Sequence, residues 1–241
     1  MNPTIIIQAR TGSKRLPNKV LANLGDKNVL YYVIKRCQLS KSINKIVIAT
    51  SNHQKDDAIE SLALTMNTSV FRGKENDVLS RFMLTATKYN ADPIIRINAD
   101  SPLIDSIVID EIYESYKNNN YDYVSIVGYP RGVCAEIFSF SSLKKSFENT
   151  QINDTRYREH VTTFIIDNPN LFNIKHLEAP KELNDPDLRL CVDEIRDLEV
   201  VRIICNHFHP RVDFKLNEIL KFLDENSKVK EINQHVKQKE L

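Results

Sequence analysis

The chain has 241 residues, of which 41% are hydrophobic and 27% are charged, and its formal net charge at pH 7 is +1. This composition is typical of a soluble globular protein of one large or two small domains, and it excludes a disordered chain. Because a charge near zero gives no overall attraction to nucleic acid or to a membrane surface, we expect neither as a partner.

The cysteines and the lengths of the apolar stretches indicate in which cellular compartment the protein lies. Cys37, Cys134, Cys191 and Cys205 form no C-x-x-C pair and have no metal-ligand spacing with a histidine, which predicts free thiols in a reducing environment. No apolar stretch approaches 18 residues, and the first residues predict a strand, without the pattern of a signal peptide. We therefore expect a cytoplasmic protein.

Strands and helices alternate in the first half of the chain, as the spacing of its apolar residues indicates. We expect strands over Ile5–Ala9, Lys45–Thr50, Ser69–Phe71, Pro93–Asn98 and Tyr121–Val127. We expect helices over 29–37, Asp56–Met66, Asp77–Tyr89 and Ile107–Tyr116. This alternation predicts an α/β fold, with a mostly parallel central sheet flanked by helices and with the loops after the strands on one edge.

The alternation is less regular after Val127. A loop and an irregular strand are predicted over Gly128–Ser139, helices over Ser141–Asn149, Thr155–Ile166 and Glu194–Phe208, and strands over Leu171–Ala179 and Leu188–Val192. We expect one domain over residues 1–241, in which about 128–179 form an inserted lobe or a dimer arm. A short helix after Lys215 leads to a charged segment, about 227–241, that we expect to be a flexible tail.

A cationic loop follows the first predicted strand. Arg10, Lys14, Arg15 and Lys19 lie within ten residues that contain no acid and that include Gly12. Ligands of open α/β folds bind at the carboxyl ends of the strands, and Arg and Lys donate charge-assisted hydrogen bonds to phosphate. The loop lacks the G-K-[ST] ending of a Walker A motif. We favour a nucleoside triphosphate site over ordinary surface charge, because charge, glycine and strand end coincide.

Six ordered segments resemble those of the cytidylyltransferases that make CMP-activated sugars, and within that superfamily they are most similar to the spore coat polysaccharide type. They are Gln8–Leu21, Phe71–Phe82, Arg96–Asp105, Tyr129–Phe138, Arg158–Thr162 and Leu188–Glu194. The resemblance implies a Rossmann-like nucleotidyltransferase fold, CTP as the donor, dependence on Mg²⁺ and a homodimer.

The resemblance also implies a nucleotide site. Arg10 and Lys19 match the positions that bind the triphosphate, and the backbone at Gln8 and Ala9 matches the contact to cytosine. Asp77 has an alternative interpretation as a helix N-cap. The full expected nucleotide-binding set is Gln8, Ala9, Arg10, Gly12, Ser13, Lys14, Arg15, Lys19, Arg72, Asp77 and Asn98.

Two carboxylates at predicted strand ends are the expected Mg²⁺ ligands, Asp100 and Asp193. A hard cation that also binds phosphate oxygens needs only one or two protein carboxylates. The alternative for Asp100 is an Asx turn. Glu194 and Asp197 are interpreted as acids at a helix N-terminus. The expected catalytic set is Arg10, Lys19, Asp100 and Asp193.

The acceptor site is the least defined part of the resemblance, which assigns Arg131, Glu136, Arg158 and His160 to it. Arg131 suits a carboxylate or phosphate, whereas His160 has an equal alternative as a structural histidine at a dimer interface. The spore coat type more often has an acid at the position of Cys134. The acceptor is therefore expected to be anionic or polyhydroxylated, without being identified.

The expected function is transfer of CMP from CTP to such an acceptor, with release of pyrophosphate, in surface polysaccharide or glycoconjugate biosynthesis. One alternative is a nucleotide-sugar-dependent glycosyltransferase. Asp185-Pro186-Asp187 matches the D-x-D pattern of that class, but it precedes a predicted strand and is interpreted as a turn. The other alternative is a non-catalytic nucleotide-binding subunit, against which the pair of Asp100 and Asp193 argues.

Overall fold

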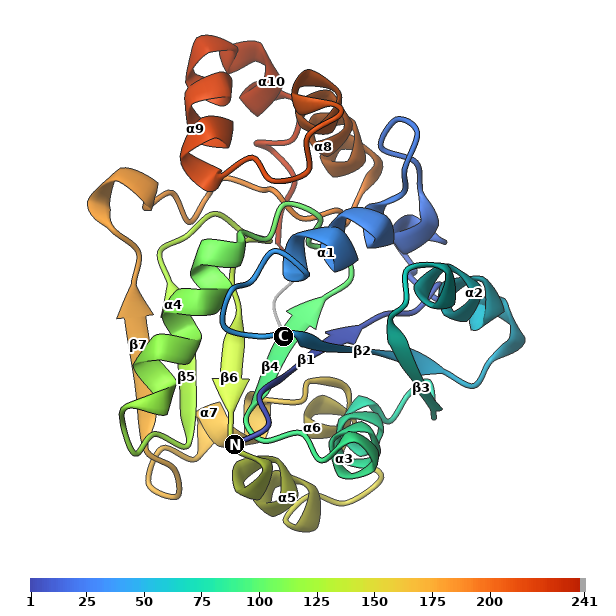
Figure 1. Ribbon diagram of the computed structural model, residues 1–241, viewed down its shortest axis with the longest axis vertical. Coiled ribbons are helices and arrows are strands. Elements are labelled where there is room, and N and C mark those ends of the chain that lie inside the picture. The colour runs from blue at the N-terminus through green and yellow to red at the C-terminus, as the bar shows by residue number, and fades with distance from the viewer. Residues whose placement is uncertain (239–241) are drawn as a thin grey trace.

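A computed structural model describes residues 1–238, and a single seven-stranded sheet lies at its centre in the order β3-β2-β1-β4-β6-β5-β7 (Figure 1). The strands are β1 (Thr4–Gln8), β2 (Lys45–Ser51), β3 (Ser69–Gly73), β4 (Ile94–Asn98), β5 (Tyr123–Val127), β6 (Glu136–Phe138) and β7 (Ile174–Glu178). The helices of nine or more residues are α1 (Val29–Cys37), α2 (Asp57–Thr65), α3 (Val78–Tyr89), α4 (Ser106–Lys117), α5 (Phe140–Glu148), α8 (Ile195–Phe208) and α9 (Leu216–Glu225). The shorter ones are α6 (Thr155–Glu159), α7 (Thr163–Asp167) and α10 (Ser227–Glu231), with 3-10 turns at Lys19–Leu21, Gln54–Asp56 and Lys181–Leu183.

The sheet confirms the expected α/β class. All of its strand pairs are parallel except those that β6 makes with β4 and β5. The parallel strands β1, β2 and β4 end side by side at Gln8, Ser51 and Asn98, which places the loops that follow them on one edge. That edge contains the cationic loop.

Two hydrophobic cores lie on the two faces of the sheet. Side chains alternate along β1, so that Ile5 and Ile7 enter a core with apolar residues of α1, α4, α8 and α9, whereas Ile6 enters a second core with α3 and with residues of α5 and α7. Figure 1 shows α3, α5 and α6 grouped at one end of the molecule, away from α8, α9 and α10. Burial on both faces explains why β1 reads as a continuous apolar run.

The segment about 128–179 is built into the main body. Its strands β6 and β7 belong to the central sheet, and its helices α5 and α6 contact α3. The helix expected over Thr155–Ile166 is divided into α6 and α7, because His160 has an extended backbone (φ −111°, ψ 93°). The strand expected over Leu188–Val192 is reduced to a single bridge between Arg131 and Arg189.

The segment from about residue 227, which the sequence suggests is a flexible tail, contains α10 and a buried side chain. Asn233 is 1% exposed. Residues 239–241 lie outside the described residues.

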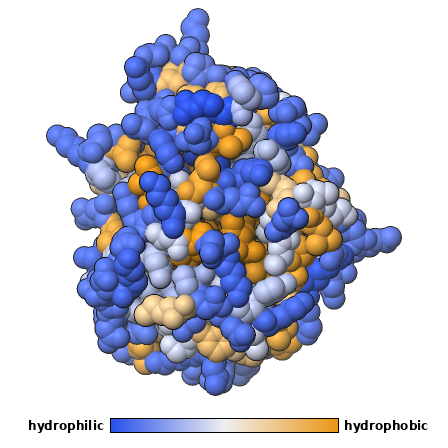
Figure 2. All heavy atoms as spheres, viewed as in Figure 1, coloured by the Kyte–Doolittle hydropathy of each residue, from blue (hydrophilic) through white to orange (hydrophobic). Residues whose placement is uncertain are grey.

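The surface seen in Figure 2 is largely hydrophilic, and its apolar side chains gather mainly near the centre of that face. Within residues 1–238, no helix combines the length and the apolar character needed to cross a membrane.

Candidate active site

A buried carboxylate holds the start of the cationic loop. Asp56, which is 2% exposed, accepts hydrogen bonds from the backbone N of Thr11 at 2.8 Å and from its hydroxyl at 2.6 Å. Its other oxygen accepts a hydrogen bond from the Ser51 hydroxyl at the end of β2. Burial disfavours the ionised form, but these hydrogen bonds lower the pKa of Asp56 below its ordinary value. The loop is thereby fixed to the neighbouring strand end.

Lys19 lies between the two carboxylates that were expected to bind Mg²⁺. It follows Asn18, whose left-handed backbone (φ 59°) ends the loop. Its Nζ is 2.6 Å from Asp100 Oδ2 and 2.8 Å from Asp193 Oδ1. Burial disfavours the ammonium form, but the two carboxylates outweigh this effect and raise the pKa of Lys19 above its ordinary value. Two acids far apart in the sequence therefore share one cation.

Asp193 contacts two further cations. Its Oδ1 is 2.8 Å from Arg15 Nη2, and its Oδ2 is 3.3 Å from Arg189 Nη2. Burial opposes ionisation of this carboxyl, yet Lys19, followed by Arg15 and Arg189, holds the pKa of Asp193 below its ordinary value. Asp193 is thus an ionised carboxylate that is oriented from several sides.

A row of polar side chains crosses one face of the sheet. Arg96, Glu136, Ser125 and His176 are register partners across β4, β6, β5 and β7. Arg96 pairs with Glu136, and Ser125 Oγ is 2.7 Å from His176 Nδ1. Gln8 Oε1 accepts a hydrogen bond from Arg96 Nε at 3.4 Å. The row therefore connects an expected nucleotide residue to an expected acceptor residue.

Arg158 and Asp77 have structural partners. Arg158 is 7% exposed, and it donates from Nε to the carbonyl oxygen of Gln151 at 3.1 Å and from Nη2 to that of Thr150. Its Nη1 lies 3.6 Å from Asp77 Oδ1. Asp77 also accepts from the backbone N of Ser80 at 3.0 Å, which confirms its interpretation as the N-cap of α3. The polar atoms of both side chains are therefore used in contacts that stabilise the packing around α3.

Arg72 also makes contacts that stabilise the fold. Its Nε and Nη2 donate to the carbonyl oxygens of Ser51 and His53, both at 2.9 Å. Its guanidinium also lies 2.7 Å from Asp57 and 2.7 Å from Glu60, at the start of α2. These four contacts connect β3 to the end of β2, to the loop after it and to α2, and they leave little of the guanidinium for a nucleotide.

The remaining expected residues lie on the cationic loop, at the ends of β1 and β4, or in the segment about 128–179. Arg10 Nη2 is 3.1 Å from Glu159 Oε1 of α6, and Ala9 is buried beside β2. Asn98 is exposed at the end of β4, and Cys134 is exposed after the Arg131 loop. Among these remaining residues, those with exposed or partly exposed polar side chains are Gln8, Arg10, Ser13, Lys14, Arg15, Asn98, Arg131 and His160.

The comparison with protein families covers nearly the whole chain. A family model described as cytidylyltransferase matches residues 4–240. The chain belongs to the cytidylyltransferase family.

Individual proteins are similar over nearly the whole chain, and one of them has a solved structure described as a cytidylyltransferase. The chain is 33% identical to the spore coat polysaccharide biosynthesis protein SpsF of Bacillus subtilis, over 92% of this chain and 93% of that protein. It is 41% identical to an uncharacterized protein of Methanocaldococcus jannaschii, over 97% and 95% of the two chains. The solved structure of a cytidylyltransferase from Leptospira borgpetersenii is similar over the full length of both chains, with a TM-score of 0.89 and 30% identity.

The pair of Glu136 and Arg96 gives a pH-dependent prediction for this cytidylyltransferase. Burial disfavours ionised Glu136, but Arg96, Tyr123 and Thr162 lower the pKa of its carboxyl. Its contribution to stability is therefore present above the pKa of an unfolded glutamate, about 4.3, and is lost as the pH falls through the lower folded value. Glu136→Gln is expected to lower the free energy of unfolding by about 2 kcal/mol at pH 7.

Urea unfolding of both proteins between pH 7 and pH 3 measures this effect. The difference between wild type and Glu136→Gln is expected to shrink below a pH of about 4.3. The exposed Glu148→Gln serves as the matched control. A difference that stays constant over the whole pH range contradicts the assignment of an ionised, stabilising Glu136.

The Arg131 loop packs against the segment that leads to Asp193. The backbone of Arg131 donates to Leu188 O at 2.9 Å and accepts from Leu190 N at 2.8 Å. Gly132 follows with φ 93°, and a Cβ added there would lie 2.6 Å from the backbone N of Cys191. Only glycine meets both requirements.

Gly132→Ala is therefore expected to lower the free energy of unfolding by about 3 kcal/mol, measured by urea denaturation. Gly12→Ala is the matched control, because a Cβ at Gly12 meets only the flexible end of Glu75, 2.5 Å away. Equal stability losses for the two variants contradict the close approach described at Gly132.

The structure brings in four residues that the sequence reasoning did not assign, Asp56, Arg96, Arg189 and His176. Asp56 had been interpreted only as the start of a helix. Arg96 and Arg189 lie inside segments that carry the resemblance, which was a usable signal. His176 matches no motif, and only its register opposite Ser125 places it in the polar row.

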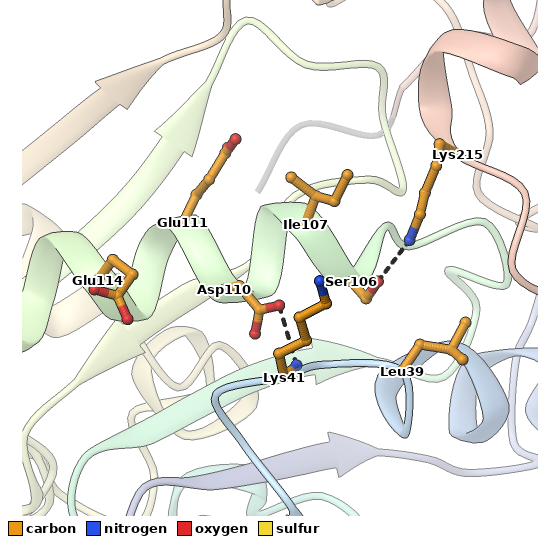
Figure 3. A pocket seen from close by; sticks show the side chains of 8 residues that line it. All are labelled: Leu39, Lys41, Ser106, Ile107, Asp110, Glu111, Glu114 and Lys215. Atoms are coloured by element: carbon orange, nitrogen blue, oxygen red, sulfur yellow. Dashed lines mark hydrogen bonds between the residues drawn. The ribbon is translucent and has the colours of Figure 1, made fainter.

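A hollow of about 450 Å³ lies elsewhere, along α4 (Figure 3). It is lined by Leu39, Lys41, Ser106, Ile107, Asp110, Glu111, Glu114 and Lys215. Lys215 Nζ donates to Ser106 Oγ at 3.0 Å, and the backbone N of Lys41 donates to Asp110 Oδ2 at 3.1 Å. Lys19, Asp100 and Asp193 are not among its lining residues, and neither is any residue of the polar row.

Proposed function

We propose that the protein transfers a cytidylyl group from CTP to an anionic sugar, a sugar or polyol phosphate, or a phosphonate, and releases pyrophosphate. The observation that carries this proposal is the convergence of Lys19, Asp100 and Asp193 at the end of a cationic loop, in a chain of the cytidylyltransferase family. The name of SpsF supports a role in surface polysaccharide or glycoconjugate biosynthesis.

The proposed reaction is an in-line displacement. An acceptor oxygen bonds to the α-phosphorus of CTP, the bond from that phosphorus to the pyrophosphate oxygen breaks, and the acceptor proton leaves to solvent. Arg10, Arg15 and Lys19 neutralise the triphosphate and stabilise the charge that grows on pyrophosphate. The chain contributes orientation and charge, so that no side-chain nucleophile is required.

We propose Mg²⁺ as the cofactor, held by Asp100 and Asp193. Within residues 1–238 no group of three His, Cys, Asp or Glu side chains is arranged to hold a metal. We propose that phosphate oxygens of the nucleotide would supply further ligands beside the two carboxylates. The donor set fits a cation, because both carboxylates already lie within 2.8 Å of the Lys19 ammonium. Bound Mg²⁺ would polarise the α-phosphate and orient the nucleotide.

We propose that the acceptor binds over the polar row, which Gln8 joins through its hydrogen bond with Arg96. Exposed Arg131 and half-buried His160 are candidates to contact its anionic group, with the Arg96–Glu136 pair below. Cys134 is an exposed thiol where the spore coat type more often has an acid, so we propose a class of acceptor and not the acceptor of that type. The described cysteines are all free, which supports our proposal that the enzyme acts in the cytoplasm. We also propose that it acts as a homodimer, as the resemblance to its family implies.

Pyrophosphate release tests the proposal. The protein is incubated with Mg²⁺, each of the four nucleoside triphosphates, and a panel of acidic sugars, sugar and polyol phosphates and phosphonates. Release is expected with CTP and one acceptor class, and it should disappear when Mg²⁺ is chelated. Turnover of a CDP- or UDP-sugar without pyrophosphate release supports a glycosyltransferase instead. Tight CTP binding without any product supports a binding subunit.

A further inference from the structure

The C-terminal segment reaches the back of the Asp193 site. Asn233 Nδ2 donates to Asp197 Oδ1 at 2.9 Å and to the carbonyl oxygen of Arg189 at 3.1 Å. Gln238 Oε1 accepts from Arg189 Nη1 at 2.8 Å. Two side chains from the end of the chain thus contact residues that lie next to an expected catalytic carboxylate.

Arg189 and Asp197 connect these two side chains to Asp193. Arg189 Nη2 is 3.0 Å from Asp197 Oδ2 and 3.3 Å from Asp193 Oδ2. Asp197 Oδ2 also accepts from the backbone N of Asp193 and from that of Glu194, both at 3.1 Å. The pair therefore fixes both the main chain and the carboxylate of Asp193.

The pair depends on Asn233 because it is buried. Arg189 is 3% exposed and Asp197 is 0% exposed, so water cannot replace a lost partner. A buried ion pair is stable only when its remaining hydrogen-bonding groups are satisfied. Asn233 supplies donors to Asp197 Oδ1 and to the Arg189 carbonyl oxygen. Without that amide, the Arg189 carbonyl oxygen would lose its side-chain partner, and Asp197 Oδ1 would keep only Arg189 Nε, at 3.1 Å.

We propose that Asn233 is a positioning residue for cytidylyl transfer, which holds the Arg189–Asp197 pair so that Asp193 keeps the orientation that the reaction requires. This inference rests on the proposed function. Asn233 is buried, and it acts through its contacts with Arg189 and Asp197. Its effect follows from the sensitivity of catalysis to carboxylate placement, because a displacement of about 1 Å can cost 10²-fold in rate.

Asn233→Leu tests the proposal, since leucine keeps a similar volume and removes the amide. We expect kcat with CTP to fall about 10- to 100-fold, as for residues that support catalytic ligands, while KM for CTP changes less than about twofold. Amide hydrogen exchange should become about tenfold faster over 191–195 and stay unchanged in β1. Gln234→Leu, at an exposed neighbouring position, is expected to match wild type in both measurements.

Wild-type kcat in a folded Asn233→Leu variant overturns the proposal, and so does an equal loss of kcat in Gln234→Leu. Faster exchange over 191–195 with unchanged kcat overturns it as well, because the contact would then serve the fold alone. If Asn233→Leu does not fold, the exposed Gln238→Leu decides: a two- to fivefold loss of kcat supports the proposal, and wild-type kcat contradicts it. If wild type releases no pyrophosphate with any substrate, the proposed function fails, while the exchange experiment still reports on the contact.

Discussion

Asp100→Asn is expected to lower the rate of pyrophosphate release by about 10³-fold, which corresponds to about 4 kcal/mol of activation free energy. The amide keeps the size of the side chain and removes the charge that lies 2.6 Å from Lys19 and that we propose to bind Mg²⁺. Asp193→Asn should cause a loss of similar size. The rate is measured at saturating CTP and acceptor, over a range of Mg²⁺ concentrations.

The matched control for this pair is Asp187→Asn. Asp187 is exposed in the turn before Arg189, at the second acid of the D-x-D pattern, and its removal is expected to leave the rate unchanged. A folded Asp100→Asn variant with wild-type turnover would remove Asp100 from the proposed metal site. A large loss in Asp187→Asn would instead favour the glycosyltransferase interpretation.

Lys19→Met is expected to have the second largest effect, with a 10²- to 10³-fold lower kcat. Methionine keeps much of the side-chain length but loses the ammonium that we propose to stabilise the leaving pyrophosphate. The same change leaves Asp100 and Asp193 without their shared cation, so we also expect the free energy of unfolding to fall by about 2 kcal/mol. Steady-state kinetics and urea denaturation measure the two effects separately.

Lys144→Met, on the exposed face of α5, is the control for Lys19→Met and is expected to change neither quantity. A Lys19→Met variant that loses stability but keeps its kcat would assign Lys19 to the fold alone.

The fold was largely predictable because burial leaves strong patterns. Ile5–Ile7 form an apolar run because both faces of β1 are covered, and helical spacing around Val33 and Phe82 gave α1 and α3. The predictions failed where backbone geometry depends on distant contacts. The 188–192 segment has the composition of a strand, yet it pairs only through the bridge from Arg131 to Arg189.

The residues of the candidate site also fall into those that the sequence predicts and those that it does not. Asp100 and Asp193 meet at Lys19, as their predicted places at two strand ends suggested, but only Asp100 follows a strand of the sheet, β4, whereas Asp193 follows the single-bridge segment 188–192. Arg158 and Arg72 have the same side-chain chemistry as a phosphate-binding arginine, and only their contacts with backbone carbonyl oxygens identify them as structural. A residue type specifies what a group can bind, whereas its actual partners depend on the tertiary structure.

The position of Lys19 has a thermodynamic consequence. The Lys19 ammonium has three N–H donors, and two of them are directed at Asp100 and Asp193, so at most one is left for a triphosphate. The divalent cation that we propose at these carboxylates would take the place of the ammonium and release its other donors for the nucleotide. Metal and nucleotide should then bind with positive cooperativity, because a coupling between two ligands is reciprocal. We therefore expect either ligand alone to bind more weakly than in the presence of the other.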